Sequence, residues 1–360
     1  MRIAVVHTVF ASKGGGERFV YEVFKRLSKF HEIRLFCNGI TPDTFNFKEF
    51  EHTIIPSRHD AFGKLVAYYE AKALGKVVKA AVEWKPDIIW LNRGYYYVGW
   101  IKKNYGIRTI PYVHYPVAIE PRKSNWIRDI YRQMIGLEKL ESASFAEAPI
   151  VLCNSNYTKS VIMKIQPSSN VHVVYPGIDH EQFFPTWEDG GYLYYNSRFQ
   201  PIKNQALTLD VAKETGYELI LSGFVSAANA NYFDSIKKRA DKLKVKIVQN
   251  PTDEEIVKLL QRCSVFLFPS IGEHFGIAPI EAMACGKPVV GHNSGGTVET
   301  VGEAGILCGD DLQDWVKITK YLMDNDDVRR EMGRKAFEFS EKFAWDKTSN
   351  EIVRVLEEVA

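Results

Sequence analysis

The stretch Ser270-Ile271-Gly272-Glu273-His274-Phe275-Gly276-Ile277-Ala278-Pro279-Ile280-Glu281 sets two carboxylates eight residues apart around a strand-to-helix turn. The apolar run that precedes it is typical of a buried strand. Pro279 is tolerated only in the first turn of a helix, so the helix is expected to begin near Ile277. We therefore expect Glu273 in the loop and Glu281 on the helix.

The glycines of this stretch suit it to contact with a ligand. Gly272 and Gly276 let the backbone approach a bound molecule closely, because they carry no side chain. The free N–H groups at the helix start offer donors to an anion. The segment is therefore suited to an anion that carries hydroxyl groups, and a nucleotide diphosphate sugar has that chemistry.

Three quoted motifs together resemble a known enzyme family. They are Glu273-His274-Phe275-Gly276-Ile277, Glu281-Ala282-Met283 and Asn293-Ser294-Gly295-Gly296. The pattern resembles the Glu-x7-Glu signature of the retaining glycosyltransferases of family 4, which have the GT-B fold. Within that family it is most similar to the mannosyltransferases that extend lipid-linked oligosaccharides, and the match runs along nearly the whole chain.

The resemblance implies a fold and roles for the residues of the stretch. The fold would be α/β, with two Rossmann-like doubly wound parallel-sheet domains that face each other across a cleft. Phe275, Gly276 and Ile277 would bind the donor. Glu281 would hold its ribose hydroxyls, and Glu273 would act in catalysis by facing the hydroxyls of the donor sugar.

Length and composition favour two ordinary globular domains. The chain has 360 residues, about twice the usual size of one domain, and 46 % of them are hydrophobic. The polar segment 176–191 contains Pro and Gly and is the expected linker. We expect an acceptor-side domain at 1–178 and a donor-binding domain at 179–345, and the resemblance implies that a terminal helix at 346–360 packs back on the first.

Short apolar runs alternate with helical periodicity from start to finish, as in parallel sheets covered by helices. Three helices are expected to close the chain, at 312–323, 328–342 and 346–358. The expected strands are 3–7, 33–37, 88–92, 109–113, 150–153 and 171–175 in the first half, and 192–196, 218–222, 245–248, 265–268, 288–291 and 305–308 in the second.

Charge is distributed unevenly between the halves. Residues 1–180 carry 25 Lys/Arg and 16 Asp/Glu, a difference of +9, whereas residues 181–360 carry 21 and 28, a difference of −7. A basic first half attracts phosphorylated or membrane-borne partners. The segment 122–132 interleaves basic and aromatic residues, which is typical either of a peripheral membrane helix or of a helix that buries Trp126 and Ile130. The acidic second half has no continuous basic stripe, so nucleic acid is not an expected partner.

The cysteines and the apolar runs indicate the compartment. Five cysteines are scattered without any Cys-x-x-Cys spacing, which favours buried thiols in a reducing environment over disulfides or a zinc site. The N-terminal apolar run is too short for a secretory signal, and about 18 consecutive apolar residues occur nowhere. We expect a cytoplasmic protein, with peripheral contact at the cytoplasmic face of a membrane left open.

A glycine-rich turn follows the first expected strand. Lys13-Gly14-Gly15-Gly16-Glu17-Arg18 opens the first helix, where N–H donors face an anion, but it matches neither the dinucleotide fingerprint nor the P-loop. It resembles the Gly-Gly-x-Glu motif of the family. That resemblance places Gly15 and Gly16 beside the donor diphosphate and Glu17 and Arg18 on the acceptor side.

Two further segments carry candidate catalytic residues at the ends of expected strands. Arg198 and Lys203 lie five residues apart across a Pro-containing turn, so that both cations can converge on one anion. The segment resembles the Arg-x4-Lys pair of the family, and both residues are assigned to the leaving diphosphate. His114 lies in a His-Tyr-Pro turn that resembles the turn whose histidine faces the donor sugar.

Three other motifs have plainer interpretations. The glycine-rich turn 291–299 either caps phosphates or shapes the site, and Ser155 is expected to cap a helix. Asp324-Asn325-Asp326 lies between helical runs and is interpreted as a turn and cap. With Arg198, Lys203 and two helix starts to neutralise a diphosphate, we expect no metal ion and no other cofactor.

The sequence thus favours a retaining hexosyltransferase. Departure of the diphosphate would be the chief barrier, and donors placed in advance would lower it. The resemblance favours mannose from GDP-mannose, with a glycan or polyprenyl-linked saccharide as acceptor. Three alternatives stay open: a UDP-sugar donor (glucose, galactose or N-acetylglucosamine), a GT-B-like sugar-nucleotide epimerase, and a non-catalytic sugar-nucleotide-binding subunit.

Overall fold

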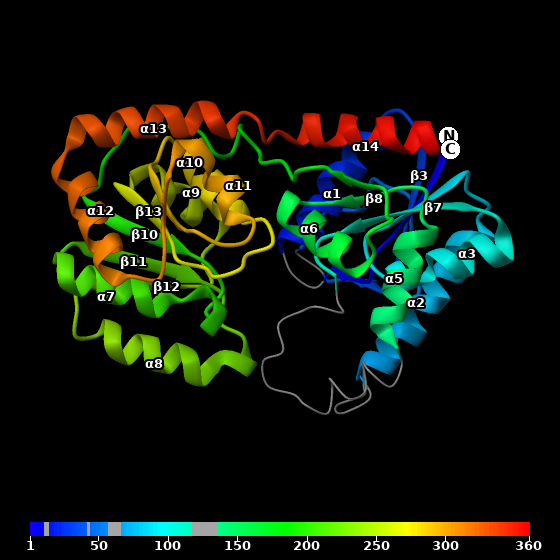
Figure 1. The fold of residues 1–360 in the computed structure, drawn as a ribbon, viewed down its shortest axis with the longest axis horizontal. Coiled ribbons are helices and arrows are strands. Elements are labelled where there is room, and N and C mark those ends of the chain that lie inside the picture. The colour runs from blue at the N-terminus through cyan, green and yellow to red at the C-terminus, as the bar shows by residue number, and fades with distance from the viewer. Residues whose placement is uncertain (11–13, 42–43, 57–65, 117–135) are drawn as a thin grey trace. The chain divides into compact units, whose positions relative to one another are not determined.

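The computed structural model describes residues 1–10, 14–41, 44–56, 66–116 and 136–360. The chain forms two compact units (Figure 1). Unit 1 comprises Met1–Gly177 and Trp345–Ala360, and unit 2 comprises Ile178–Ala344. The observed division falls one residue before the boundary expected at 178/179, and the terminal helix belongs to unit 1.

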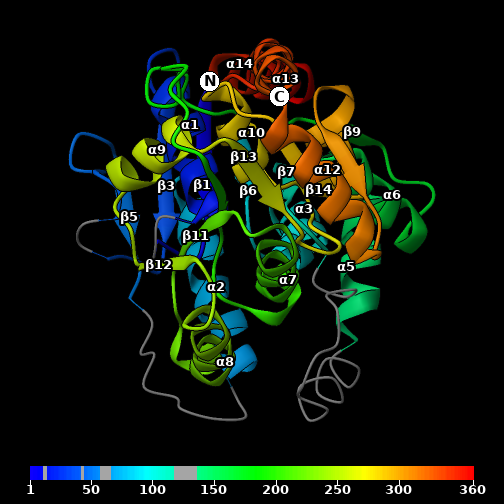
Figure 2. The same ribbon diagram turned by 90° about the vertical axis from the view of Figure 1, so that its left-hand side faces the viewer.

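The sheet of unit 1 has seven strands, all paired in parallel, in the order β5-β3-β1-β6-β7-β8-β9 (Figures 1 and 2). The strand order reverses between β1 and β6, which makes this the topological switch point. The strands are β1 (Arg2–Val6), β3 (Glu32–Cys37), β5 (His52–Ile54), β6 (Ile88–Leu91), β7 (Arg108–Val113), β8 (Val151–Cys153) and β9 (Val171–Val173), and β2 (Val9–Phe10) pairs separately with β4 (Gly39–Ile40).

Apolar side chains of unit 1 form one core on each face of its sheet. One core joins α1 and α14 to alternate strand residues such as Val5 and Trp90, and the other includes α2, α3 and α5 residues. Both faces are covered, as expected for a doubly wound sheet. The helices are α1 (Gly15–Leu27), α2 (Val66–Glu83), α3 (Val98–Tyr105), α5 (Leu137–Glu147), α6 (Asn156–Ile165) and α14 (Trp345–Val359), with a 3-10 turn η1 (Tyr95–Tyr97).

Helix α14 belongs to the core of unit 1 although it comes from the far end of the chain. Trp345 at its start is 2 % exposed and lies 6.1 Å from the ring of Phe19 in α1. Arg26 of α1 forms a 2.6 Å ion pair with Asp346. Figure 1 shows α14 close to the N-terminus and α1. The expected return of the terminal helix to the first domain is therefore observed.

The sheet of unit 2 has six parallel strands in the order β12-β11-β10-β13-β14-β15, with its switch point between β10 and β13. Its strands are β10 (Tyr192–Asn196), β11 (Glu218–Gly223), β12 (Val245–Gln249), β13 (Val265–Phe268), β14 (Val289–His292) and β15 (Ile306–Cys308). Its helices are α7 (Gln205–Thr215), α8 (Ala230–Ala240), α9 (Asp253–Arg262), α10 (Ile277–Ala284), α11 (Thr297–Val301), α12 (Leu312–Asp324) and α13 (Asp326–Ser340), with 3-10 turns η3 (Pro201–Lys203), η4 (Ala227–Asn229) and η5 (Gly302–Ala304).

The expected elements are present, with ends shifted by one or two residues. All twelve expected strands and the three terminal helices occur. The strands β2, β4 and β5 were not expected, because segments of two or three residues carry little apolar pattern. Ser155 caps α6 by accepting a 2.9 Å hydrogen bond from Thr158 N, as expected. The five cysteines are free and buried.

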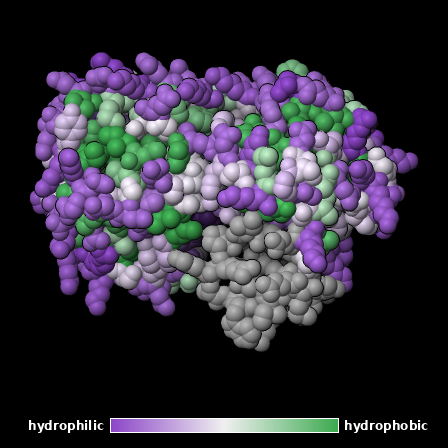
Figure 3. Space-filling model, in the orientation of Figure 1, coloured by the Kyte–Doolittle hydropathy of each residue, from purple (hydrophilic) through white to green (hydrophobic). Residues whose placement is uncertain are grey.

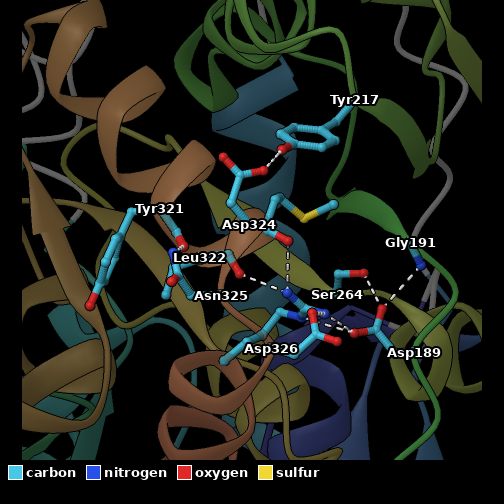
Figure 4. Close-up of polar contacts among 11 residues, drawn as sticks. Asp189, Gly191, Tyr217, Ser264, Tyr321, Leu322, Asp324, Asn325 and Asp326 are labelled. Carbon is cyan, nitrogen blue, oxygen red and sulfur yellow. Dashed lines mark hydrogen bonds and ion pairs between the residues drawn. The ribbon is translucent and has the colours of Figure 1, made fainter.

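The Asp-x-Asp motif at 324–326 is part of a structural polar cluster (Figure 4). Arg329 forms ion pairs with Asp326 and with Asp189 of the segment that precedes β10. Asp324 accepts a hydrogen bond from Tyr217. The cluster connects the turn between α12 and α13 to the segment that precedes β10. Asp324 and Asp326 therefore lie at a turn, as expected. In the described part of the chain, no group of three His, Cys, Asp or Glu side chains has a metal-binding arrangement.

The surface of unit 2 is hydrophilic along α13. Helix α13 buries Gly333, Ala336 and Ser340 and exposes much of its remaining surface, and Figure 3 shows hydrophilic side chains along this edge. Among the described helices, none combines the length and apolar character needed to cross a bilayer. The basic and aromatic segment 122–132, for which membrane contact was left open, lies outside the described residues.

Candidate functional site

The candidate site of unit 2 lies at the switch point of its sheet. The loop that carries Arg198 and Lys203 follows β10, and the loop that carries Glu273 follows β13. These two strands are neighbours and parallel, so both loops leave the same edge of the sheet. Ligands of open α/β sheets bind at this edge, outside the carboxyl ends of the strands, where the strand order reverses.

The loop after β10 is held by a buried glutamine. Gln205, 1 % exposed, donates hydrogen bonds of 2.9 Å to Ser197 Oγ and to Arg198 O, and accepts one of 2.8 Å from Tyr232. Gly223 lets β11 approach this loop, because a Cβ there would lie 1.7 Å from Ser197 O. The backbone of Arg198 is therefore fixed, while its side chain is exposed.

Lys203 and Glu273 form an ion pair that joins the two loops. The side chains are 14 % and 20 % exposed, and Ser270 donates a 3.0 Å hydrogen bond to Glu273 Oε2. Burial alone would raise the pKa of Glu273, but the charge and hydrogen bond of Lys203, with smaller help from His274 and Ser270, hold that pKa below its ordinary value. Glu273 is therefore an anion at neutral pH.

The glycine-rich turn after β14 holds the backbone of the Glu273 loop through hydrogen bonds. Ser294 Oγ accepts a 2.9 Å hydrogen bond from Gly272 N, and Gly296 N donates one of 2.6 Å to Glu273 O. The left-handed Gly295 (φ 61°) comes so close that a Cβ would lie 2.4 Å from Glu273 O. These contacts show that the turn helps to shape the Glu273 loop, and its expected alternative role of capping phosphates stays a prediction.

A short hydrogen-bond chain extends this support toward the surface. His292 Nδ1 lies 2.8 Å from Ser294 Oγ, and its Nε2 lies 3.0 Å from Asp310 Oδ1. The Asp310 carboxylate only accepts, so Nε2–H donates to it, and Nδ1 of the neutral ring then accepts from the Ser294 hydroxyl. Asp310 and His292 thus fix the hydroxyl that holds the Gly272 backbone.

Helix α10 begins at Ile277, as expected from the position of Pro279. Gly276 caps it in the left-handed region (φ 89°), Glu273 lies in the loop, and Glu281 lies on the helix at 9 % exposure. The ring of Phe275 is 5 % exposed and lies 5.9 Å from that of Phe343. The Phe275 side chain therefore packs within unit 2, and Ile277 is half-buried in the first turn.

Unit 1 brings together another part of the predicted set. Helix α1 begins at Gly15, which is exposed, and a Cβ there would meet no atom within 4 Å. A Cβ on Gly16 would lie 3.8 Å from His114 Nε2, so the helix start and the histidine turn are neighbours. Glu17 and Arg18 are half-buried in the first turn of α1.

The sequence analysis missed the residues that position this machinery. Gln205 was not singled out, and His292 was quoted only within the glycine-rich motif, because Gln205 is the first residue of α7 and His292 the last of β14, where side-chain direction depends on the fold. Ser294 was quoted only as part of a motif. The signal that could have found them is a polar residue near the end of a buried strand. That signal alone does not distinguish a residue that supports a loop from one that contacts a ligand.

Two family models match the chain. The model described as "Glycosyltransferase Family 4" matches residues 13–182, and the model described as "Glycosyl transferases group 1" matches residues 179–339. The two matches together extend across both units.

Curated relatives are about a quarter identical to the chain within the segments that align. An uncharacterised glycosyltransferase of Methanocaldococcus jannaschii is 26 % identical over 58 % of this chain and 60 % of its own length. The alpha-1,3/1,6-mannosyltransferase ALG2 of Kluyveromyces lactis is 28 % identical over 60 % and 54 %. A D-inositol 3-phosphate glycosyltransferase of Corynebacterium jeikeium is 24 % identical over 73 % and 70 %. The chain thus spans less than two thirds of the length of the first two.

Solved structures resemble the chain over its full length. A sucrose-phosphate synthase from Thermosynechococcus elongatus superimposes with a TM-score of 0.83 at 16 % identity, covering 99 % of this chain and 98 % of that one. HepE of Anabaena, solved in complex with UDP and glucose, gives 0.79 at 20 % identity, covering 99 % and 100 %. At such identities the likeness concerns the fold.

The contact between the glycine-rich turn after β14 and the Glu273 loop can be tested by substitution of Gly295. We expect Gly295→Ala to destabilise unit 2 by about 1–3 kcal/mol, because its Cβ would overlap Glu273 O and its φ is left-handed. Urea unfolding measures this. Gly309→Ala is the matched control, since its Cβ would meet nothing within 4 Å. Equal stabilities of the two variants would contradict the described contact.

The Lys203–Glu273 pair can be tested by the pH dependence of stability. Because the Glu273 pKa is lowered, ionised Glu273 stabilises the wild-type protein above its unfolded pKa of about 4.5, and this contribution is lost as the pH falls through the folded pKa. In Lys203→Met burial dominates and the Glu273 pKa rises. We therefore expect the loss of unfolding free energy in the variant to grow from about pH 4 to pH 7.

The control for this experiment is Lys335→Met, which removes an exposed partner of Glu331. Exposed ion pairs contribute little to stability, so the loss of unfolding free energy in this variant is expected to be small and nearly independent of pH. A Lys203→Met penalty that does not change with pH would show that Glu273 is not held as a carboxylate by Lys203.

Proposed function

Because the chain belongs to glycosyltransferase family 4 and has the GT-B fold, we propose that it transfers a hexosyl group from a nucleotide diphosphate sugar to a hydroxyl acceptor. The observation that carries the proposal is the Lys203–Glu273 pair beside Arg198 at the switch point of unit 2. It combines cations for a diphosphate with a carboxylate for sugar hydroxyls at the edge where ligands bind.

Arg198 and Lys203 bind the diphosphate and stabilise it as it leaves. Breaking the anomeric C–O bond places negative charge on the departing phosphate, and cations fixed in advance lower that barrier. The exposed guanidinium of Arg198 is available on a backbone locked by Gln205. Lys203 reaches the phosphate by exchanging part of its interaction with Glu273 for one with the new anion.

Glu273 and Glu281 bind hydroxyl groups. Glu273 accepts hydrogen bonds from the donor sugar and stabilises the positive character that its ring develops, which requires the carboxylate form that Lys203 and Ser270 maintain. Glu281 holds the ribose hydroxyls from α10. Gly276 and Ile277 offer the backbone of the helix start to the phosphates, and Phe275 contributes its backbone because its ring is buried.

In unit 1, Gly15 and Gly16 approach the donor closely, and His114 faces the transferred sugar. The open space at Gly15 and the contact between Gly16 and His114 support this assignment. Glu17 and Arg18 serve the acceptor. We propose transfer with retention of anomeric configuration, in which the departing phosphate accepts the proton of the attacking hydroxyl, and we propose that no metal ion is required because Arg198 and Lys203 supply the positive charge.

Mannose from GDP-mannose is the proposed donor, with a glycan or polyprenyl-linked saccharide as acceptor. The Glu-His-Phe-Gly-Ile motif and the similarity to the mannosyltransferase ALG2 support this choice. A UDP-sugar is the second candidate, because HepE, which shares the fold, was solved with UDP and glucose. In either case the protein acts in the cytoplasm, and peripheral contact with a membrane is part of the proposal for a lipid-linked acceptor.

A donor panel tests the proposed function. Purified protein is incubated with GDP-mannose, UDP-glucose, UDP-galactose and UDP-N-acetylglucosamine, with a membrane lipid extract as acceptor source and with EDTA present. We expect release of GDP and glycosylation of a lipid-extractable saccharide with GDP-mannose alone. Arg198→Ala is expected to lower kcat by roughly a hundredfold, the usual effect of removing one pre-placed donor of about 3 kcal/mol.

Each contrary outcome identifies what is wrong. Turnover with a UDP-sugar would replace the donor, and loss of turnover in EDTA would contradict metal independence. Conversion of the donor without acceptor would indicate an epimerase or hydrolase. Donor binding without turnover under all conditions would indicate a binding subunit.

The role of the α1 start is tested by Gly15→Ala. The structure accommodates the methyl group, because its Cβ would meet nothing within 4 Å, and Ala suits a helix better than Gly. We expect stability unchanged within about 1 kcal/mol and the donor KM raised, because the methyl group occupies the space of the ligand. Wild-type kinetics in this variant would show that no ligand approaches Gly15.

A further inference from the structure

The switch point of unit 1 carries two polar residues that the proposed machinery does not use. His7 directly follows β1 and Asn92 directly follows β6, the two neighbouring strands between which the strand order reverses. Val6 pairs with Leu91 in this parallel pair, so His7 and Asn92 are the next residues in register. They continue the alternation of Val5 and Trp90, whose side chains lie on the α1 face of the sheet.

Both side chains are buried with their polar atoms unsatisfied. His7 is 1 % exposed and Asn92 is not exposed. Neither ring nitrogen of His7 and neither amide atom of Asn92 has a hydrogen-bond partner among the described residues. Each such atom costs about 1–3 kcal/mol, so a pair of side chains with four of them is far from what a core built for stability would contain.

Their surroundings place these residues at the edge of the core. His7 lies against Phe10, with ring centroids 4.7 Å apart. One residue further along the chain, Thr8 is half-buried and Arg93 is exposed. The polar atoms are thus one residue from the surface, on the edge of the sheet from which ligands of α/β folds are bound.

The chemistry of the pair matches an uncharged hydroxyl. Burial, with a smaller effect of the Arg93 charge, lowers the pKa of His7 to about 3, so the imidazole is neutral and offers one donor and one acceptor. The Asn92 amide also offers both. A hydroxyl group donates and accepts in the same way, whereas a phosphate would find no charge on either side chain and a cation would be opposed by Arg93.

We propose that His7 and Asn92 form a subsite in unit 1 that binds hydroxyl groups of the uncharged sugar or polyol part of the acceptor. The proposal rests on the proposed function and adds to it. The two residues bind and orient the acceptor through neutral hydrogen bonds, while the charged residues of unit 2 bind the donor. Their lack of hydrogen-bond partners among the described residues is the stability cost of that site.

Binding of small polyols to the full chain tests the proposal. The probes are methyl α-D-mannopyranoside, methyl α-D-glucopyranoside and myo-inositol, with inorganic phosphate as the charged counter-probe. Saturation-transfer NMR detects binding of each polyol, and nitrogen spectra of the histidine rings report the effect of each probe on His7. We expect at least one polyol to bind and to shift the His7 ring nitrogen resonances of the wild-type protein, and phosphate to leave them in place. His7→Phe and Asn92→Leu are expected to weaken that binding by about tenfold or more.

A matched control separates binding from folding. Thr319 of α12 is also fully buried with an unpartnered hydroxyl, and Thr319→Val removes it in unit 2 without touching this edge. We expect Thr319→Val to keep polyol binding, and Asn92→Leu to keep or raise Tm while losing it. His7→Gln retains hydrogen bonding and is expected to bind better than His7→Phe, which addresses the case in which the Phe variant does not fold.

Two results would overturn the subsite. One is polyol binding of equal strength in the wild type, His7→Phe and Asn92→Leu, and the other is no polyol binding and no His7 shift in a wild-type protein that binds GDP. GDP binding is measured in the same samples, so that a failure of the subsite is distinguished from a failure of the proposed donor site.

Discussion

The ion pair between Lys203 and Glu273 is the interaction on which the chemistry of unit 2 depends. Both side chains are largely shielded from water, where an isolated charge is costly, and the charge of Lys203 keeps Glu273 ionised by lowering its pKa. The pair sits at the carboxyl ends of two adjacent strands, next to the exposed Arg198. In the proposed function, an entering diphosphate meets the cations of Arg198 and Lys203, the second of them largely buried, and a carboxylate that is available for hydroxyl groups.

Much of the surrounding sequence serves to hold this pair in place. Gln205 fixes the loop after β10, and the Ser294 turn, backed by His292, fixes the loop after β13. Unit 1 uses the same topology with a different chemistry, since His7 and Asn92 at its switch point are neutral and their polar side-chain atoms find no partner in the part of the chain that the structure describes. Under the proposed function, one fold used twice offers a charged site for an anionic donor and a neutral subsite for a hydroxyl acceptor.

Most of the fold was predictable from sequence, because parallel strands buried on both faces appear as continuous apolar runs. Pro279 indicated the start of α10. The expected doubly wound parallel sheet is confirmed in each of the two units. The short strand β5 was missed because only three partly exposed residues form it. The partners of the site were not predictable in this way: Lys203 and Glu273 lie 70 residues apart. Likewise, His7 was interpreted only as the end of a strand, since a polar residue there looks the same whether it is solvated or buried.

The central claim is that Arg198 and Lys203 bind the second phosphate of a nucleoside diphosphate. Calorimetric titration of GDP against GMP, and of UDP against UMP, measures what that phosphate adds to binding in the wild type, in Arg198→Ala and in Lys203→Met. The account predicts that a diphosphate binds the wild-type protein much more tightly than its monophosphate and that this advantage largely disappears in both variants. An advantage of the same size in all three proteins would contradict it.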